Sequence, residues 1–134
     1  MISTLLVLAS LMGATGVVLA AAAAHAAPGA GLDSAAYLLL FHAVAVLGAA
    51  ALTRQGLLWP PAALAAMAGF VLGGVLFAGD VSMRAFAGHR LFPMAAPAGG
   101  TILIIAWLVL AVASIVIIVR GRWLPFRPRR MNGT

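Results

Sequence analysis

The stretch AGFVLGGVLFAGDVSMRAFAGHRLFPMAAPAGG, residues 68–100, decides how this chain can fold. It begins as an apolar, glycine-rich run, meets Asp80 and Arg84, continues as a short basic segment, and becomes apolar again from Pro97. Long apolar runs on both sides of a short charged segment are typical of two helices that cross a bilayer and are joined outside it. The stretch therefore predicts an all-α, polytopic membrane protein.

The composition of the whole chain agrees with this prediction. Of the 134 residues, 65% are hydrophobic and only 7% are charged, and the mean hydropathy is +1.17. A soluble domain carries roughly 25% charged residues, so this chain has too few polar groups to cover its surface in water. It also contains no cysteine, which excludes disulfide and thiolate chemistry.

Four apolar segments are long enough to cross a bilayer, which takes roughly 20 residues. We expect one bundle of four transmembrane helices in a single domain covering 1–134, with helices at about 2–27, 34–52, 60–87 and 97–119. The first segment ends in Ala24-His25-Ala26, which matches a signal-peptide cleavage pattern, but no Lys or Arg precedes it and it is long. We interpret it as a retained span. Asp33 or Ser34 is expected to cap the second helix, and Gly88 to end the third.

The positions of the cations predict the orientation in the membrane. All eight are arginines: five lie in the tail 120–134, Arg54 lies between the second and third spans, and Arg84 and Arg90 lie between the third and fourth. Because cytoplasmic connections are enriched in positive charge, this distribution of six against two places both termini in the cytoplasm. We expect a multi-pass protein of the bacterial cytoplasmic (inner) membrane, with Trp59 and Trp123 at the same interface.

The basic tail has a further interpretation. A sequence pI near 12.0 would suggest nucleic-acid binding in a soluble protein. In a membrane protein, cytoplasmic arginines act as a topology anchor and attract anionic lipid. We therefore expect the lipid bilayer, including anionic lipid, as a partner, and no nucleic acid.

Several motifs occur in a characteristic order. A glycine-rich first helix ending in Ala-His is followed by Tyr37-x-x-x-Phe41-His42-Ala43, by Leu76-Phe77-Ala78-Gly79, and by Ala96-Pro97-Ala98-Gly99-Gly100 before a span containing Trp107. This order, between about residues 12 and 113, resembles the YgdD/YwdK-like family of small bacterial membrane proteins, known as domain of unknown function four-two-three. The resemblance implies a four-span membrane architecture and assigns no reaction.

The histidines are the first candidate functional residues. His42 lies inside the second span, and ionisable residues within a membrane indicate function by default. It could be a neutral ring that bonds a neighbouring helix, or a proton-relay or ligand-binding residue. His25 could approach it and, with His89 and Met83 or Met94, form a soft metal site. Because none of these residues has the spacing of a known ligand motif, we predict no metal.

A second candidate is the charged cluster of Asp80, Arg84, His89 and Arg90 after the third span. The spacing of Asp80 and Arg84 allows an ion pair on one helix face. The pair could be exposed and contribute little to stability. If the two residues pair, exchanging their charges should restore part of what either single reversal loses. Alternatively, a partly buried Asp80 could orient Arg84 towards a lipid phosphate, because an arginine fork suits phosphate geometry.

Glycines at helical spacings predict close packing of helices. The candidates are Gly13, Gly16, Gly69, Gly73, Gly79, Gly99 and Gly100. They could serve contacts within one bundle or between protomers, and we favour the former.

No catalytic constellation is present in the sequence: there is no Ser/His/acid set on one face, no pair of carboxylates and no phosphate-binding glycine loop. We expect no enzymatic activity and no cofactor. The leading hypothesis is a structural or accessory subunit of a membrane complex or homo-oligomer. The alternative is a minimal transporter or lipid- and anion-binding module that uses His42 and the charged cluster, although a transporter would normally show internal repeats and broken helices.

Overall fold

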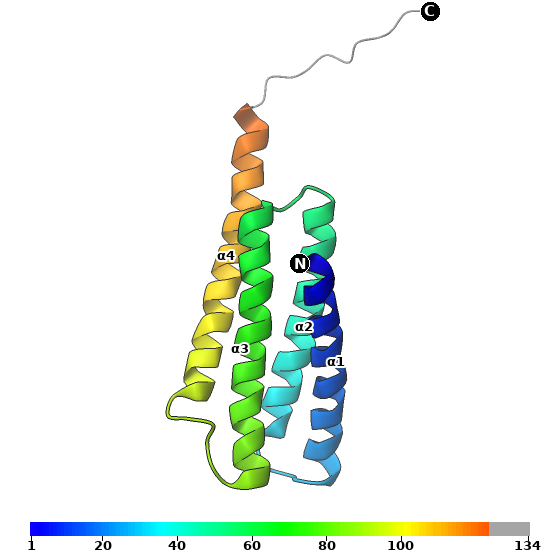
Figure 1. Ribbon diagram of the computed structural model, residues 1–134, viewed down its shortest axis with the longest axis vertical. Coiled ribbons are helices and arrows are strands. Elements are labelled where there is room, and N and C mark those ends of the chain that lie inside the picture. Colours follow the sequence, from blue (N-terminus) through cyan, green and yellow to red (C-terminus); the bar gives the residue numbers. More distant parts are fainter. Residues whose placement is uncertain (124–134) are drawn as a thin grey trace, which may run out of the picture.

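The computed structural model describes residues 1–123, which form four α-helices joined by short loops (Figure 1). The helices are α1 (Ile2–His25), α2 (Leu32–Arg54), α3 (Pro60–Ala87) and α4 (Ala95–Trp123). All four are long and apolar enough to cross a membrane. The prediction of an all-helical protein with four such helices is confirmed. Most of the predicted basic tail, from residue 124 onward, lies outside the described residues.

The first two helices are bounded by glycine-containing turns. α1 ends at His25, two residues earlier than expected, and the amides of Ala26 and Ala27 both bond the Ala22 carbonyl at 2.9 Å. α2 begins at Leu32 after Gly31, whose φ of +78° suits glycine. The predicted side-chain cap is wrong, because Asp33 and Ser34 lie within the helix.

The last two helices follow the prolines and glycines of the sequence. Pro60 and Pro61 occupy the first turn of α3, where a missing amide hydrogen removes no helical bond. Gly88 ends α3 with a φ of +74°. α4 begins at Ala95, two residues before Pro97, and continues to Trp123, four residues past the predicted end. It extends further than predicted because polar residues can remain helical beyond the apolar segment.

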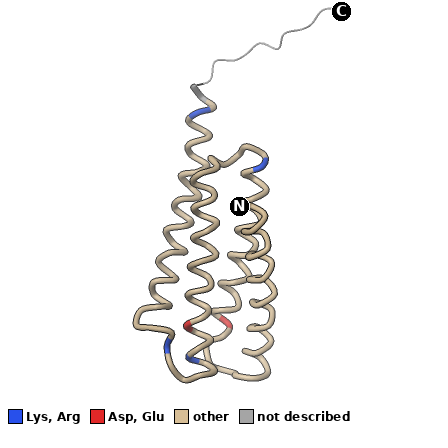
Figure 2. Tube along the Cα trace, viewed as in Figure 1, with Lys and Arg blue, Asp and Glu red and all other residues tan. Residues whose placement is uncertain are grey.

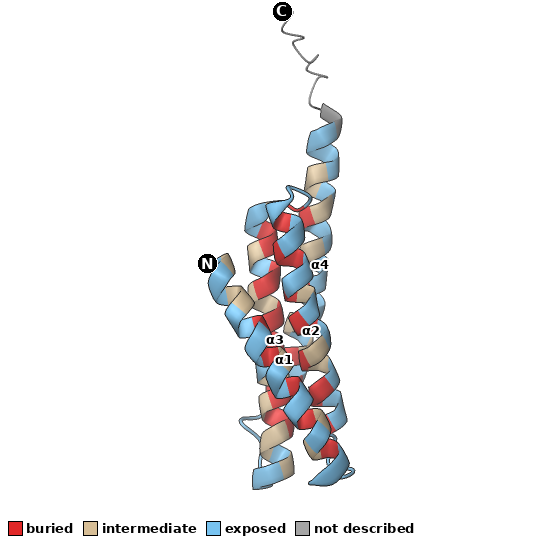
Figure 3. Ribbon diagram, turned by 90° about the vertical axis from the view of Figure 1, so that its right-hand side faces the viewer, coloured by how far each residue is buried: buried red, intermediate tan, exposed pale blue. Residues whose placement is uncertain are grey.

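The two middle helices form the centre of the bundle. α2 packs against α3, α1 packs mainly against α2, and α4 packs mainly against α3 (Figures 1 and 3). Buried residues make up 44% of the apolar windows of α2 and α3, but only 22% in α1 and 17% in α4. The outer surfaces of α1 and α4 are therefore the main apolar surfaces available to lipid.

Glycines bring α3 and α4 into backbone contact. A Cβ atom on Gly73 would lie 2.8 Å from the Gly99 carbonyl oxygen, and one on Gly99 would lie 2.7 Å from the Phe77 amide nitrogen. One turn away, a Cβ atom on Gly69 would lie 2.9 Å from the Cβ atom of Ala106. These distances are too short for any side chain larger than hydrogen, so these glycines permit the close approach of the helices.

The contact between α1 and α2 is looser. A Cβ atom on Gly16 would lie 2.8 Å from Cγ of Leu40, whereas one on Gly13 would lie 3.9 Å from the Cβ atom of Ala43, an ordinary contact. Gly16 thus fills a tight position, and Gly13 could be replaced by alanine without a clash.

Two of the candidate packing glycines do not contact another helix of this chain. A Cβ atom on Gly79 would lie 3.2 Å from Cδ1 of Leu91, in the loop between α3 and α4. A Cβ atom on Gly100 would meet nothing within 4 Å. Close packing within the bundle therefore does not require glycine at position 100.

The loop between α2 and α3 is hydrogen-bonded to the backbone of α4. The Trp59 amide donates a hydrogen bond to the Ala113 carbonyl at 3.0 Å, and the Arg120 guanidinium lies 5.4 Å from the centre of the Trp59 ring. α4 continues for ten residues after Ala113, or about 15 Å. The shared interface of Trp59 and Trp123 stays a prediction, and the side chain of Trp123 lies outside the described part of the chain.

Candidate functional site

Charged residues gather at the two ends of the bundle (Figure 2). Arg54 ends α2, and Arg120 lies near the end of α4. Asp80 and Arg84 lie in the last turns of α3, and Arg90 follows in the loop to α4. The second group includes both carboxylate and guanidinium groups and is the more promising as a binding site.

Asp80 is buried at the end of the α3–α4 interface, with 1% of its surface exposed. Its Oδ2 forms an ion pair with Nε of Arg84 at 3.2 Å, and its Oδ1 accepts a hydrogen bond from the Leu91 amide at 3.0 Å. The Arg84 side chain is 42% exposed. The structure therefore excludes an ion pair in which both side chains are exposed. It supports the alternative in which a buried carboxylate orients the arginine.

Asp80 also fixes the loop between the helices. Leu91 lies 11 residues further along the chain, and its bond to Asp80 ties the loop to α3. Arg90 directly precedes Leu91, so the same carboxylate that binds Arg84 also restrains the backbone next to Arg90. A single buried acid thus holds the Arg84 side chain and restrains the backbone next to Arg90.

The two arginines face a common hollow of about 350 Å³, here called the α3–α4 pocket. Its lining residues are Phe77, Asp80, Arg84, Arg90, Ala96, Pro97 and Gly100. Two arginines and one aspartate give the pocket one net positive charge. The first turns of α4 form one wall, and a helix N-terminus carries a partial positive charge that favours anions. The arrangement is electrostatically suited to an anion.

His89 does not belong to this pocket. It is exposed, and its Nδ1 lies 3.1 Å from the carbonyl oxygen of Arg90, within hydrogen-bond distance. Of the four residues in the predicted charged cluster, the structure brings Asp80, Arg84 and Arg90 together around one hollow and leaves His89 outside.

His42 is buried between three helices. Its Nδ1 lies 2.7 Å from the Leu38 carbonyl oxygen, and its Nε2 lies 3.2 Å from Nε1 of Trp107 on α4. Its ring centre is 5.3 Å from that of Phe70 on α3, which in turn lies 4.9 Å from the Trp107 ring. His42 therefore links α2, α3 and α4.

These partners define the state of the His42 ring. The indole nitrogen of Trp107 can only donate, so Nε2 of His42 must accept, and Nδ1 carries the hydrogen that is donated to Leu38. A protonated ring would direct an N–H group at the indole N–H group. Because both nitrogens have partners inside the bundle, the geometry favours the structural interpretation of His42 over a proton relay.

His25 lies apart from His42. It is exposed at the end of α1, whereas His42 is in the interior of α2. Within residues 1–123, no group of three or more His, Cys, Asp or Glu side chains could hold a metal ion. The structure thus does not bring the histidines into a common site.

We expect Trp107→Phe to weaken the attachment of α4. Phenylalanine preserves the ring contact with Phe70 but removes the donor to His42, and interhelical hydrogen bonds in membranes contribute about 0.5–2 kcal/mol. The free energy of unfolding in detergent should fall by that amount. In a double-mutant cycle with His42→Phe, the two losses should be non-additive. Simple addition would show that the two side chains do not interact.

Two partners in these sites were not found from the sequence. The sequence motifs include Trp107 only as a feature of the fourth span, and they do not indicate the Leu91 amide. The first could have been suspected, since a buried histidine needs a partner and Trp107 is the only side-chain N–H donor in the apolar part of the fourth span. The second is a backbone group, for which the sequence carries no signal.

Comparison with known proteins identifies a family whose model matches most of the chain. A family model described as "Protein of unknown function (DUF423)" matches residues 12–100. The match includes His42 and every residue that lines the α3–α4 pocket, whereas Trp107 lies beyond it. No curated protein and no solved structure matches the chain.

Proposed function

This chain belongs to the DUF423 family of proteins of unknown function, and from that premise we propose a role based on its geometry. It is a non-enzymatic, multi-pass protein of the bacterial cytoplasmic membrane that binds a phosphate-bearing lipid headgroup in the α3–α4 pocket. The observation that carries the proposal is the buried Asp80 carboxylate, which holds Arg84 directly and restrains the loop next to Arg90.

The chemistry of the pocket supports a phosphate ligand. Asp80 binds Arg84 through Nε, so the two terminal amino groups of that guanidinium are not needed for the ion pair. Arginine presents its donors in a planar fork that matches phosphate oxygens. Arg90 adds a second guanidinium, and within residues 1–123 it forms no ion pair. A headgroup phosphate would neutralise the net positive charge of the pocket.

The charge distribution supports a location at the outer interface. Arg54 and the five arginines from Arg120 onward outnumber Arg84 and Arg90, and positive connections remain in the cytoplasm. Both termini would then be cytoplasmic, and the α3–α4 pocket would face the opposite leaflet.

The orientation predicts which end of the chain reagents can reach. A cysteine introduced at His89 should react with a membrane-impermeant maleimide in intact cells, since the natural chain has no cysteine that would interfere. A cysteine introduced at Gln55 should react only after the cells are opened. The reverse pattern would contradict the proposed orientation.

The ligand can be tested with a matched pair of arginine variants. Arg90→Gln removes one charge from the pocket without disturbing the Asp80–Arg84 pair, whereas Arg54→Gln removes one charge from the other end. Hydrogen bonds to charged groups contribute about 1.5–3 kcal/mol, so Arg90→Gln should weaken binding of phosphatidylglycerol about tenfold or more. Arg54→Gln should leave it nearly unchanged. Equal losses of lipid affinity in the two variants would indicate a net-charge effect. They would contradict binding of the lipid in the α3–α4 pocket.

The alternative hypothesis also included a role as a minimal transporter, and the shape of the helices does not support that role. Each of the four helices in residues 1–123 runs without interruption, whereas many secondary transporters bind their substrates at broken helices. We therefore keep the binding role and do not propose transport.

An accessory role in a complex or homo-oligomer is a second candidate, and Gly48 favours it. This glycine is exposed on α2, and a Cβ atom there would meet nothing within 4 Å. Because glycine has no side chain, the backbone of an outer helical face can be approached closely at this position by a helix of another protein. Co-purification of a defined partner, or self-association that Gly48→Leu abolishes, would support this role. Recovery as a lone monomer in mild detergents would contradict it.

A further inference from the structure

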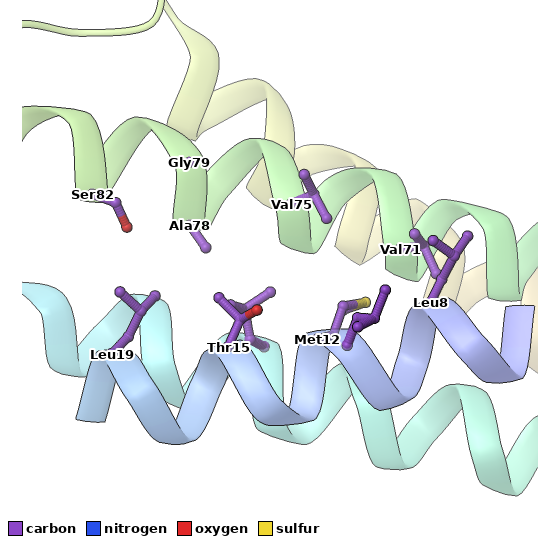
Figure 4. Close-up of a pocket in the computed structure, with 11 residues that line it drawn as sticks. Leu8, Met12, Thr15, Leu19, Val71, Val75, Ala78, Gly79 and Ser82 are labelled. Atoms are coloured by element: carbon purple, nitrogen blue, oxygen red, sulfur yellow. The ribbon is translucent and has the colours of Figure 1, made fainter. Parts of the chain in front are cut away.

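A second hollow of about 350 Å³ lies between α1 and α3, with Leu39 of α2 also lining it (Figure 4). We call it the α1–α3 groove. One half is lined by apolar side chains, including Leu8, Met12, Val71 and Val75. The other half contains the hydroxyl groups of Thr15 and Ser82, which Figure 4 shows in the space between the two helices.

Neither of these two hydroxyls has a hydrogen-bond partner within residues 1–123. Four helical hydroxyls donate to the carbonyl four residues earlier, at 2.6–3.3 Å: Ser10, Thr53, Thr101 and Ser114. Among residues 1–123, no such bond is formed by Thr15 or Ser82, although each has a carbonyl four residues earlier. Thr15 lies opposite Ala78, further from the α3–α4 loop than Ser82 (Figure 4), and in apolar surroundings an unpaired hydroxyl costs roughly 2–7 kcal/mol. A ligand with a hydrogen-bonding group at this level would remove that cost.

The length and depth of the groove match one leaflet. Ser82 lies 22 residues after Pro60, or about 33 Å along α3, close to the roughly 30 Å thickness of the hydrocarbon core. With Pro60 at one interface, Ser82 lies at the other. Val71, at the far end of the groove, lies 11 residues from Ser82, or about 16 Å deeper, near the bilayer midplane. A transmembrane helix would need a surface twice as long.

We propose that the α1–α3 groove binds one acyl chain of a glycerophospholipid from the leaflet next to the α3–α4 loop. The chain lies along the apolar half towards Val71, and its ester carbonyl accepts hydrogen bonds from the hydroxyls near the interface. This site is separate from the α3–α4 pocket, because Ser82 is two residues from both Asp80 and Arg84, about 200° around the helix. The inference therefore does not depend on the proposed function.

Photolabelling of the full chain in lipid nanodiscs tests the site. Two phosphatidylcholine probes carry a diazirine on one acyl chain, either near the carboxyl group or near the chain end. The first should label peptides around Thr15 and Ser82, and the second should label peptides around Leu8 and Val71. The opposite depth order, or uniform labelling of all exposed helical faces, would overturn the proposal, as would crosslinking of the groove to a second protein chain.

A matched pair of tryptophan variants controls for bulk lipid. Val75→Trp fills the groove and should abolish the preferential labelling, whereas Leu72→Trp, exposed on the same helix but outside the groove, should preserve it. Labelling that survives Val75→Trp would overturn the proposal. If Val75→Trp does not fold, the paired change Thr15→Val and Ser82→Ala serves instead. It should reduce labelling near the carboxyl group about threefold by removing the two donors, and unchanged labelling would overturn the proposal.

Discussion

Replacing Gly99 by alanine is expected to weaken the bundle, while the same change one residue later, at Gly100, is expected to strengthen it slightly. A Cβ atom on Gly99 would lie 2.7 Å from the Phe77 amide nitrogen and 2.8 Å from the Gly73 carbonyl oxygen. Both neighbours are backbone atoms, so the clash can be relieved only by moving α4 away from α3. Overpacking of this kind costs about 1–3 kcal/mol.

Gly100 is the matched control because it lies in the same turn of α4. A Cβ atom there meets nothing within 4 Å, and alanine favours the helix over glycine by about 1 kcal/mol. Free energies of unfolding in mixed micelles should therefore change in opposite directions for the two variants. Equal stabilisation of both would show that α3 and α4 do not approach as closely as described. Gly99→Leu should separate the helices more severely than alanine.

Asp80→Ala is expected to destabilise the α3–α4 end of the bundle by about 1–3 kcal/mol, the cost of leaving buried polar groups unpaired. The change removes the acceptor of the Leu91 amide and the partner of Arg84. Asp80→Asn should cost less, because the asparagine oxygen can still accept from Leu91. If the alanine and asparagine variants are equally stable, Asp80 does not hold the loop.

Exchanging the charges of Asp80 and Arg84 tests whether the two positions are equivalent. Only position 80 is buried and accepts the hydrogen bond from Leu91. From the sequence, Asp80→Arg combined with Arg84→Asp was expected to restore part of the lost stability. The structure changes this expectation, because position 80 is buried and its side chain must accept the Leu91 hydrogen bond. Arginine has no acceptor, so we expect no rescue. Recovery of stability in the exchanged variant would show that the Leu91 bond is unimportant.

The number and approximate bounds of the helices could be predicted because length and turn residues determine them. Pro60 and Gly88 mark the ends of α3 as the sequence suggested. The packing of the helices could not be predicted in the same way. Each helix is apolar on nearly every side, so no amphipathic pattern identifies the face that contacts a neighbour. For that reason the contact between His42 and Trp107 is visible only in the structure.

The candidate site was predictable only in part. The ion pair of Asp80 and Arg84 follows from their separation by one helical turn, and the structure contains it. The burial of Asp80 and its bond to Leu91 depend on the path of the loop, which includes the positive φ of +70° at Met94. A methionine in that conformation carries no sequence signal, so the joint positioning of the two arginines could not be foreseen.

The proposed role of Asp80 is to organise an anion site, and the affinity of the Asp80→Asn variant for phosphatidylglycerol tests this role most directly. Asp33→Asn is the control, since it removes the same charge from an exposed position in the first turn of α2. If the site acted only through net charge, removing a carboxylate would strengthen anion binding in both variants. We predict that Asp80→Asn weakens the binding, because Arg84 loses its ionic partner, whereas Asp33→Asn does not weaken it. Stronger binding by Asp80→Asn than by the natural chain would contradict this role of Asp80.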